Sequence, residues 1–512
     1  MIPILSSVQA RAFDRFLSER CAVPGLLLME NAGRNAASAV HERLGQAARV
    51  LCVCGTGNNG GDGFVLARHL LRLGHDVRVV LLGRGEQVAG DARVNLDAWR
   101  GIGGGLLEID TDTGVKERLD ALWDGADGIV DALFGTGLSR ELSGRFRAAV
   151  ESMNGSGRRV FALDLPSGMH ADTGSALGIA VRAQVTITFG HPKPGLLTTS
   201  GADLCGELVV ADLGVPSERG AAREPRAHWV EVNDALGWLE PREASAHKGR
   251  SGRVLVIAGS PGKTGAALLA STAALRAGAG LVTIATFPDA QRSLDQRVIE
   301  VMTEPLDPER PVASLERLLE GVGAVVIGPG LGLSAGARAV IEQVVLKWPG
   351  PKLVDADAIS AFAGRARELA SAAGSCLLTP HPGELGRLLG VTPAVVEADR
   401  FGAIERAVEL TGQGVLLKGP HTLIAEPGTP PWVVSEGHPA LATGGSGDTL
   451  AGIVGALLVH LPRLRAAALG VVLHGHAARL WVTAHGGADR GLLAREIADF
   501  LPDARSGLGS SE

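Results

Sequence analysis

The chain has 512 residues and a formal net charge of −6, with 71 glycines, few aromatic residues and five cysteines. Its length is enough for two or more domains, and the lack of a basic block argues against nucleic acid or an anionic membrane as a partner. No apolar run is long enough to span a bilayer, and the cysteines form neither a CxxC pair nor a disulfide framework. We therefore expect a globular α/β protein of a reducing, cytoplasmic compartment.

The first βαβ unit surrounds a glycine-rich loop. We expect its elements in this order: helices between residues 6 and 44, a strand at 49–54, a loop at 55–63, a helix at 64–73 and a strand at 77–82. Gly55, Gly57 and Gly60 match the GxGxxG pattern of dinucleotide-binding folds, in the strand–turn–helix context that the pattern requires. Arg84 stands where an acidic residue would hold a ribose, which argues against a standard NAD dehydrogenase site.

Polar side chains follow three of the expected strands, which end near residues 54, 131 and 164. They are Asn59, Asp131, Asp164 and Ser167. Because the carboxyl ends of parallel strands meet at one edge of a sheet, we expect these side chains to lie together. Their hard oxygen atoms suit an alkali or alkaline-earth cation. Alternatively, each of them is an N-cap or turn residue. His191, in a His-Pro-Lys-Pro-Gly turn, is interpreted as a loop residue rather than a catalyst.

Three motifs of this half, GNNGGDG, DALFGTGL and LDLPSG, resemble the N-terminal domain of NAD(P)H-hydrate epimerases over about residues 5–215. The resemblance implies a Rossmann-like three-layer domain that interconverts the R and S forms of hydrated NADH and NADPH and binds K⁺. It implies K⁺ ligands at Asn59, Asp131 and Ser167. Because epimerisation requires the hydroxyl to leave and return, one carboxylate can act as acid and then as base, and we expect Asp164 in that role. The substrate contacts that the resemblance implies are Asn58, Asn59, Gly60, Gly61, Asp62, Gly135, Thr136, Gly137, Leu138, Ser139, Arg140, Glu141 and Asp164.

The boundary between the halves is expected in a turn-rich, charged stretch. We predict a first domain at residues 1–215, a linker at 216–240 and a second domain at 241–512. The second half opens with another βαβ unit, whose strands are expected at 253–258 and 281–285. Its loop contains Gly262-Lys263-Thr264 but is not a P-loop, because Ile257 stands where that motif needs glycine. Ala266 instead leaves room for a ring to approach.

Further strand-end loops follow, and they carry His381 and Lys418. Near the end, the stretch from Pro439 to Gly452 contains Gly444, Gly445 and Gly447, whose flexible backbone can turn several N–H groups towards one anion. A helix expected from Leu450 to Leu458 would add its N-terminus to this anion site. Asp448 at its mouth could accept a proton from a substrate hydroxyl that attacks a phosphoryl group. Alternatively, Asp448 only sits near the N-cap of that helix.

The motifs GPGLG, TPHPGE, KGPHT and GGSGDTLAG resemble the ribokinase-like family, and within it the ADP- or ATP-dependent NAD(P)H-hydrate dehydratases, over about residues 225–505. The resemblance implies a ribokinase-like α/β domain that phosphorylates the hydrate and eliminates phosphate. Asp448 would be the base, with ADP as the expected donor and Mg²⁺ on its phosphates. Hydrate contacts are implied at Ala266, Gly330, His381 and Asp448. Nucleotide contacts are implied at Lys418, Gly419, Pro420, His421, Thr422 and Gly447.

Together the halves predict one enzyme with two activities, an isomerase and a lyase, that repairs hydrated NADH and NADPH. Its expected partners are these small molecules and ADP, and we expect a homo-oligomer, as is common for large α/β enzymes. One alternative is a vitamin-precursor or sugar kinase fused to a nucleotide-binding domain, which would share the anion site and Asp448. Another is a nucleotide-sensing protein on an inactive scaffold, against which Asp164 and Asp448 argue.

Overall fold

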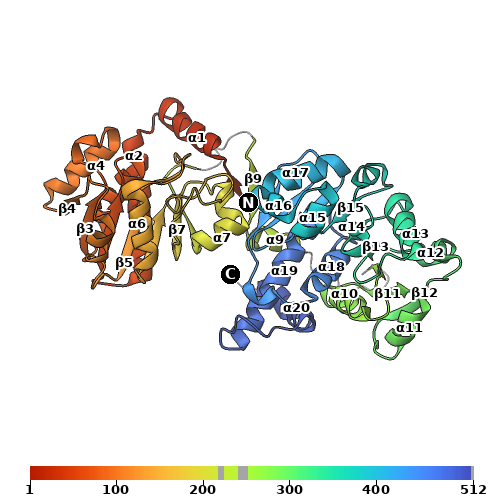
Figure 1. Ribbon diagram of the computed structural model, residues 1–512. Helices are drawn as coiled ribbons and strands as arrows, with labels where there is room; N and C mark the ends of the chain where they lie inside the picture. The colour runs from red at the N-terminus through yellow and green to blue at the C-terminus, as the bar shows by residue number, and fades with distance from the viewer. Residues whose placement is uncertain (217–223, 240–251, 509–512) are drawn as a thin grey trace. The chain divides into compact units, whose positions relative to one another are not determined.

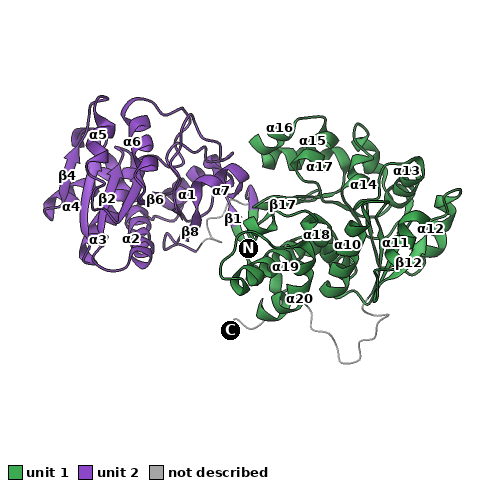
Figure 2. Ribbon diagram, turned by 60° about the horizontal axis from the view of Figure 1, so that its bottom comes forward, with its two compact units in different colours: residues 1–2, 228–512 green, residues 3–227 purple. Residues whose placement is uncertain are grey.

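The computed structural model describes residues 1–216, 224–239 and 252–508 (Figure 1). The chain forms two compact units (Figure 2), one from Pro3 to Ala227 and the other from Met1–Ile2 together with His228–Glu512. The division lies inside the predicted linker 216–240. That linker also contains strand β9 (Ala227–Val230) and helix α9 (Val232–Leu236). Residues 217–223 and 240 of the linker, and the first residues of the predicted second domain, 241–251, lie outside the described residues.

A seven-stranded sheet in the order β4-β3-β2-β5-β6-β7-β8 forms the centre of the first unit, and all of its neighbouring strands are parallel. Its strands are β2 (Arg49–Cys54), β3 (Asp76–Leu81), β4 (Gly105–Glu108), β5 (Gly128–Ala132), β6 (Arg159–Leu163), β7 (Val185–Phe189) and β8 (Glu207–Ala211). Its helices are α1 (Ser7–Arg20), α2 (Gly25–Leu44), α3 (Asn58–Arg72), α4 (Gly90–Gly101), α5 (Val115–Asp120), α6 (Gly144–Gly155) and α7 (Thr199–Cys205).

Helices cover both faces of this sheet. Successive side chains of a strand point to opposite faces. Cys52 and Cys54 of β2 therefore join the core beneath α2, α3 and α4, whereas Leu51 and Val53 join the core beneath α5 and α6. The first unit thus has the three layers that the sequence predicts. Burial also raises the pKa of the Cys52 thiol, and among the five cysteines, all in the described residues, Cys21 is exposed while the others are buried.

The sheet of the second unit contains the order β9-β18-β17-β16-β15-β14-β13-β10-β11-β12. In the part of this order that runs from β16 to β12, each strand is parallel to the next. Strand β17 is antiparallel to both β16 and β18. The strands are β10 (Arg253–Ile257), β11 (Leu281–Thr286), β12 (Met302–Pro305), β13 (Ala324–Ile327), β14 (Lys352–Val354), β15 (Cys376–Leu378), β16 (Gly414–Leu417), β17 (Thr422–Ala425) and β18 (Trp432–Val434). Strand β1 (Ile2–Ile4) begins at the N-terminus.

Four helices pack on one face of this second sheet, α10 (Thr264–Ala277), α18 (Ser446–Leu457), α19 (Arg463–Ala484) and α20 (Ala494–Leu508), and their apolar residues share a core with Val254, Val326 and Leu353. The other helices are α11 (Pro288–Asp295), α12 (Pro311–Leu319), α13 (Ala335–Glu342), α14 (Asp357–Ser360), α15 (Pro382–Leu389), α16 (Pro393–Ala398) and α17 (Arg400–Thr411). None of the described helices combines the length and apolar character that a membrane span needs.

Two helices begin earlier than the sequence predicts. Helix α3 starts at Asn58 rather than Phe64, and α18 starts at Ser446 rather than Leu450. In both cases the first turn consists of glycines and polar residues, which carry no apolar periodicity. The glycines instead permit close packing. A Cβ on Gly60 would lie 1.9 Å from the carbonyl oxygen of Gly55, so the start of α3 can rest directly on the preceding loop only without a side chain there.

This close approach predicts a stability difference between two glycine substitutions. Gly60→Ala should lower the free energy of unfolding by roughly 1–3 kcal/mol, because the methyl group would overlap a backbone atom. Gly101→Ala, at the end of α4, is the control, since a Cβ there meets nothing within 4 Å. It should be neutral or stabilising by up to about 1 kcal/mol. Urea unfolding followed by circular dichroism measures both, and equal stabilities of the two variants would contradict the packing argument.

Candidate active sites

A cavity of about 630 Å³ opens at the carboxyl ends of β2, β5 and β6 in the first unit. Most of the substrate contacts expected from the sequence line it, namely Asn58, Asn59, Asp62, Gly135, Thr136, Gly137, Leu138, Ser139, Arg140 and Asp164. Three expected contacts are not part of its lining. Gly60 and Gly61 are buried, and Glu141 is exposed. The strand-end loops therefore converge as parallel-sheet geometry requires.

Asp164 follows the last residue of β6 and occupies the left-handed region, with φ of +62°. Non-glycine residues are uncommon in that region, and such strain concentrates at functional sites. Its Oδ2 accepts hydrogen bonds from Thr136 N (2.8 Å) and Thr136 Oγ1 (2.5 Å), and its Oδ1 accepts one from Lys193 Nζ (2.5 Å). Burial alone would raise the pKa of Asp164, but Lys193 and Thr136 outweigh it and hold the pKa below its usual value. Asp164 is thus a carboxylate at neutral pH.

Lys193 also lines the cavity, and the sequence analysis gave it no role. Its side chain is 4% exposed, and its ammonium group also donates to Thr188 Oγ1 (3.0 Å) and Phe189 O (3.4 Å). The signal available in the sequence was its place in the His-Pro-Lys-Pro-Gly turn, just after a buried strand. A lysine is rarely fully buried unless it is paired. His191 of the same turn also lines the cavity, where burial and the charge of Lys193 lower its pKa to about 4.

Two more carboxyl groups face this cavity, Asp62 from the start of α3 and Asp14 from α1. Burial raises the pKa of Asp62 well above its usual value, and the charges of Asp164 and Asp14 raise it further. Asp62 therefore tends to hold a proton while Asp164 does not. Carboxyl groups whose pKa values are pushed apart in one site can serve as an acid and a base.

Of the three expected cation ligands, Asn59 lines the cavity, whereas Asp131 and Ser167 are not part of its lining and hydrogen-bond to each other. Asp131 is fully buried and accepts hydrogen bonds from Ser167 Oγ (2.6 Å), Ser167 N (2.8 Å) and Leu133 N (3.2 Å). Burial nevertheless raises its pKa to about 6. Asn59 is 8% exposed, and neither the oxygen nor the nitrogen of its side-chain amide has a hydrogen-bond partner. A buried amide without partners is costly, so the donor set of a carboxylate, a hydroxyl and a free amide oxygen fits a hard cation.

The second unit contains a cavity of about 490 Å³, formed by the loops after β10, β13 and β14 and by the start of α18. It brings together three of the four expected hydrate contacts, Ala266, Gly330 and Asp448. Lys263, Ala356 and Asp357 also line it, and the sequence analysis gave none of these a role. Ala356 has a φ of +50°, so a strained backbone is present at this site as well.

Glycines at two positions shape this second cavity. Gly330 has a φ of +59°, and a Cβ there would lie 2.9 Å from the carbonyl oxygen of Lys263, so the loop can approach the β10 loop only without a side chain. Gly445 precedes α18 with a φ of +92°, and a Cβ there would lie 2.5 Å from Leu269. Such a turn leaves the first N–H groups of α18 free of intrahelical partners beside Asp448, as an anion site requires.

Burial raises the pKa of Asp448 to about 6, with the charges of Asp355 and Glu384 adding to the effect and Lys418 opposing it. Asp355 is 2% exposed, and its Oδ1 accepts hydrogen bonds from Lys418 Nζ (2.8 Å) and Thr379 Oγ1 (2.8 Å). Burial alone would lower the pKa of Lys418, but the carboxylates of Asp355, Glu384 and Asp448 outweigh it and raise the pKa. Asp355 directly follows β14, and the sequence analysis did not predict its pairing with Lys418.

The expected nucleotide contacts occupy the turn between β16 and β17, where Lys418, Gly419, Pro420, His421 and Thr422 are consecutive. A Cβ on Gly447 would lie 3.5 Å from Lys418 Nζ, which places the start of α18 beside this turn. His381 differs from the other expected hydrate contacts. It does not line the 490 Å³ cavity, its side chain is 51% exposed, and its Nδ1 accepts a hydrogen bond from Gly383 N (3.0 Å) at the start of α15. Its contact with the hydrate stays a prediction.

Comparisons with known proteins agree with this geometry. Residues 254–503 match the family model of NAD(P)H-hydrate dehydratase, and residues 25–195 match that of the YjeF-related protein N-terminus. A solved ADP/ATP-dependent NAD(P)H-hydrate dehydratase from Bacillus subtilis is 32% identical, with a TM-score of 0.50, and the match covers 55% of this chain and 99% of that one. The expected α/β class is confirmed, with a Rossmann-like unit followed by a ribokinase-like unit.

Some relatives match this chain over nearly its whole length, across both halves. The bifunctional NAD(P)H-hydrate repair enzyme of Moorella thermoacetica is 41% identical over 511 residues, which cover 98% of this chain and 96% of that protein. The corresponding enzyme of Coxiella burnetii is 38% identical, with 98% and 99% of the two chains covered. That of Escherichia coli is 35% identical, with 94% and 90% covered. With both cavities present in one chain, this protein belongs to the family of bifunctional NAD(P)H-hydrate repair enzymes.

Proposed function

We propose that this chain repairs hydrated NADH and NADPH, with the first unit interconverting the R and S hydrates and the second dehydrating the S hydrate. One observation carries the proposal. In each unit, loops that carry the family's motifs line a cavity. They are the loops of Asn59, Gly135 and Asp164 in the first unit and those of Gly330 and Asp448 in the second. In each cavity a nearby lysine opposes the rise in pKa that burial causes in a carboxyl group, Asp164 in the first and Asp448 in the second. The similarity to repair enzymes over nearly the whole chain favours this function over a small-molecule kinase fused to a nucleotide-binding domain.

In the first unit, Asp164 and Lys193 can act as a pair. Epimerisation requires the hydroxyl on the carbon next to the ring nitrogen to leave as water and to return on the other face. The Lys193 ammonium group can give the departing oxygen its proton while the ring nitrogen supplies the electron pair. On return, the added water gives a proton back to the site. Because the pKa of Asp164 lies below its usual value, Asp164 starts as a carboxylate. We therefore assign the first proton transfer to Lys193 instead of the Asp164 expected from the sequence, and Asp164 can stabilise the positive ring that forms between these steps.

In the second unit, Asp448 is the proposed base. Its carboxylate takes the proton of the substrate hydroxyl, whose oxygen forms a bond to the terminal phosphorus of the nucleotide as the bond to the leaving nucleotide breaks. Phosphate then leaves the ring carbon, and a proton leaves the adjacent carbon, which restores the double bond of the dihydronicotinamide. A pKa of about 6 keeps Asp448 ionised at neutral pH yet more basic than an ordinary aspartate.

The proposed donor is ADP, with Mg²⁺ on its phosphates. The carboxylates of Asp355, Glu384 and Asp448 all interact with the single positive charge of Lys418. The site therefore has an excess of negative charge that a bound cation would reduce. A bound Mg²⁺ would neutralise the phosphates. In the first unit, Asn59, Asp131 and Ser167 would hold K⁺, which would satisfy the free Asn59 oxygen. A cytoplasmic location and a homo-oligomer stay predictions.

The first test follows the recovery of dihydronicotinamide absorbance from mixed R and S hydrates with ADP or ATP. Asp448→Asn should lower dehydration by a factor of about 10² to 10⁴, because it removes the base. Asp164→Asn should still consume the S hydrate and leave the R form. The wild-type rate should fall as the pH drops through about 6, where Asp448 becomes protonated. Most of the activity remaining in Asp448→Asn would contradict the assignment of the base.

The pairing of Lys193 with Asp164 predicts a change in how stability depends on pH. In the wild type the pKa of Asp164 is lowered, so its contribution is present above the usual pKa of an aspartate and is lost only in acid. In Lys193→Met, only the hydrogen bonds from Thr136 are left to oppose burial, the largest influence, so that pKa should rise. The free energy of unfolding should therefore decrease as the pH rises from about 4 towards 7.

Lys116→Met is the matched control, because Lys116 is about half exposed in the same unit and pairs with Asp120. It should keep the wild-type dependence on pH and the wild-type epimerisation rate, whereas Lys193→Met should lose epimerisation. Chemical unfolding at a series of pH values measures the first effect. Parallel curves for the two lysine variants would refute the pairing.

The cation site predicts a specific response to K⁺. At constant ionic strength, KCl should raise the melting temperature of the first unit relative to choline chloride, since a ligand that binds only the folded state stabilises it. Asn59→Leu should abolish this response without a loss of stability in K⁺-free buffer, because the Asn59 amide has no partner to lose. Asn31→Leu is the control. It loses a hydrogen bond to Leu213 O (2.9 Å) but should keep the K⁺ response. Equal melting temperatures in the two salts would exclude the site.

A further inference from the structure

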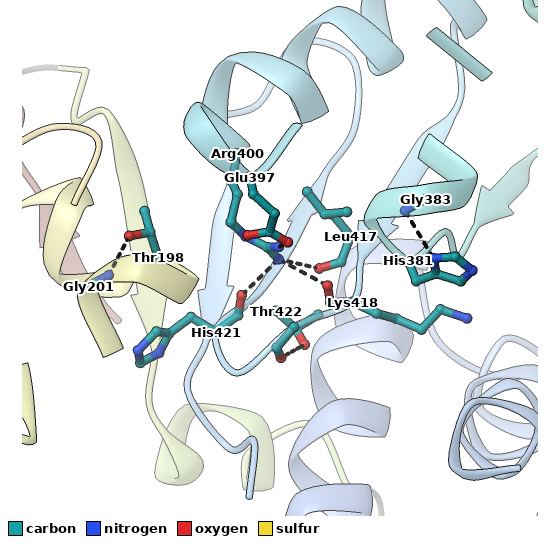
Figure 3. Close-up of polar contacts among 11 residues, drawn as sticks. Thr198, Gly201, His381, Gly383, Glu397, Arg400, Leu417, Lys418, His421 and Thr422 are labelled. Carbon is teal, nitrogen blue, oxygen red and sulfur yellow. Dashed lines mark hydrogen bonds and ion pairs between the residues drawn. The ribbon is translucent and has the colours of Figure 1, made fainter. Parts of the chain in front are cut away.

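A fully buried arginine lies beneath the turn that carries the expected nucleotide contacts. Arg400 is the first residue of α17, and it is 1% exposed. Its Nη2 group donates hydrogen bonds to three carbonyl oxygens of the turn, those of Leu417 (3.3 Å), Lys418 (3.1 Å) and His421 (3.4 Å), as Figure 3 shows. Its Nη1 group donates to Glu397 Oε1 (2.8 Å). A single side chain thus gathers the backbone of residues 417–421.

The energetics argue that Arg400 has a role beyond filling space. Burial lowers the pKa of its guanidinium group, with Glu397 opposing the effect. Replacing a buried ion pair with apolar residues is often neutral or stabilising, so such a pair is weak evidence for a purely stabilising role. What the guanidinium provides, and an apolar side chain cannot, is a rigid set of donors that fixes several carbonyl groups at once.

Fixing the carbonyl groups also fixes the N–H groups. A peptide unit is planar, so its C=O and N–H bonds point in opposite directions. With the Lys418 carbonyl turned towards Arg400, the N–H of Gly419 faces the other side. The Gly419 carbonyl is itself held by Thr422 Oγ1 (3.1 Å). The turn therefore directs carbonyl oxygens, which would repel an anion, towards the protein interior. In Figure 3 the Lys418 side chain also extends away from Arg400.

Gly419 makes this contact possible. A Cβ on Gly419 would lie 2.5 Å from Arg400 Nη2, so the turn can rest on the guanidinium only without a side chain at this position. Gly419 does not have a positive φ. Its backbone conformation therefore suits alanine, and the guanidinium is the obstacle to a side chain.

We infer that Arg400 is a positioning residue for the nucleotide donor, holding residues 417–422 so that Lys418 and the outward N–H of Gly419 meet the phosphates of a nucleoside di- or triphosphate. This inference rests on the proposed dehydratase function. Arg400 does not touch the nucleotide itself. Its effect is therefore expected on nucleotide binding, and much less on the hydrate or on the chemical step.

Arg400→Lys keeps the charge but loses the fork of donors. The KM for ADP or ATP should rise about tenfold, which corresponds to about 1.4 kcal/mol, with kcat and the KM for the hydrate within about twofold of wild type. The matched control is Arg463→Lys. Arg463 is also the first residue of a helix, and it bonds the carbonyl oxygen of Cys376 (3.1 Å) and the carboxylate of Glu426 (3.3 Å), away from the nucleotide turn. Arg463→Lys should change stability without changing the KM for the nucleotide.

Gly419→Ala disturbs the same contact by adding a methyl group to the turn, and it leaves Arg400 unchanged. It should also raise the KM for the nucleotide, and its effect should be smaller in the Arg400→Lys background, where the crowded guanidinium is gone. This double-mutant cycle reports a coupling that a general loss of stability would not produce. Additive effects would overturn the inference, as would equal rises in KM for nucleotide and hydrate. If the wild type neither binds ADP or ATP nor dehydrates the hydrate, the proposed function fails instead.

Discussion

Each unit depends on one buried contact between a strand-end carboxylate and a lysine. In the first unit Lys193 lies 2.5 Å from Asp164, and in the second Lys418 lies 2.8 Å from Asp355. Removing either partner would leave the other charge buried and unpaired, which is strongly unfavourable. The loops that carry these four residues come from different strands. Each pair therefore fixes two loops relative to one another. The shape of the cavity beside each pair depends on that constraint.

The pairs also affect the pKa values of the remaining carboxyl groups in each site. Each lysine neutralises only one charge, although further acids surround it. The excess negative charge, together with burial, raises the pKa of Asp62 in the first unit and of Asp448 in the second. In the second site Asp448, with a pKa of about 6, lies beside the Lys418–Asp355 pair. The first site places Asp164, whose pKa is lowered, beside Asp62, whose pKa is raised. Proton transfer needs this kind of separation, and two equivalent aspartates would not provide it.

Much of this organisation could be predicted from the sequence, because strands and their glycine-rich ends carry local signals. The strand at 49–54 and the contributions of Ala266, Gly330 and Asp448 to one cavity are examples. Other features could not be predicted. Helix α3 begins inside a run of glycines, which shows no apolar periodicity. Lys193 meets Asp164 from 29 residues further along the chain, and such a pairing has no local signature.

The distribution of thiols has a practical consequence. Cys21 is exposed at the end of α1, whereas the other four cysteines are buried, and burial raises the pKa of Cys52, Cys54, Cys205 and Cys376. Because maleimides react with accessible thiolates, a fluorophore would attach at Cys21 without any engineering. Phe13 and Asp14 of the same helix line the first cavity. The emission of that dye should therefore change when a dinucleotide binds in the cavity and alters the surroundings of α1.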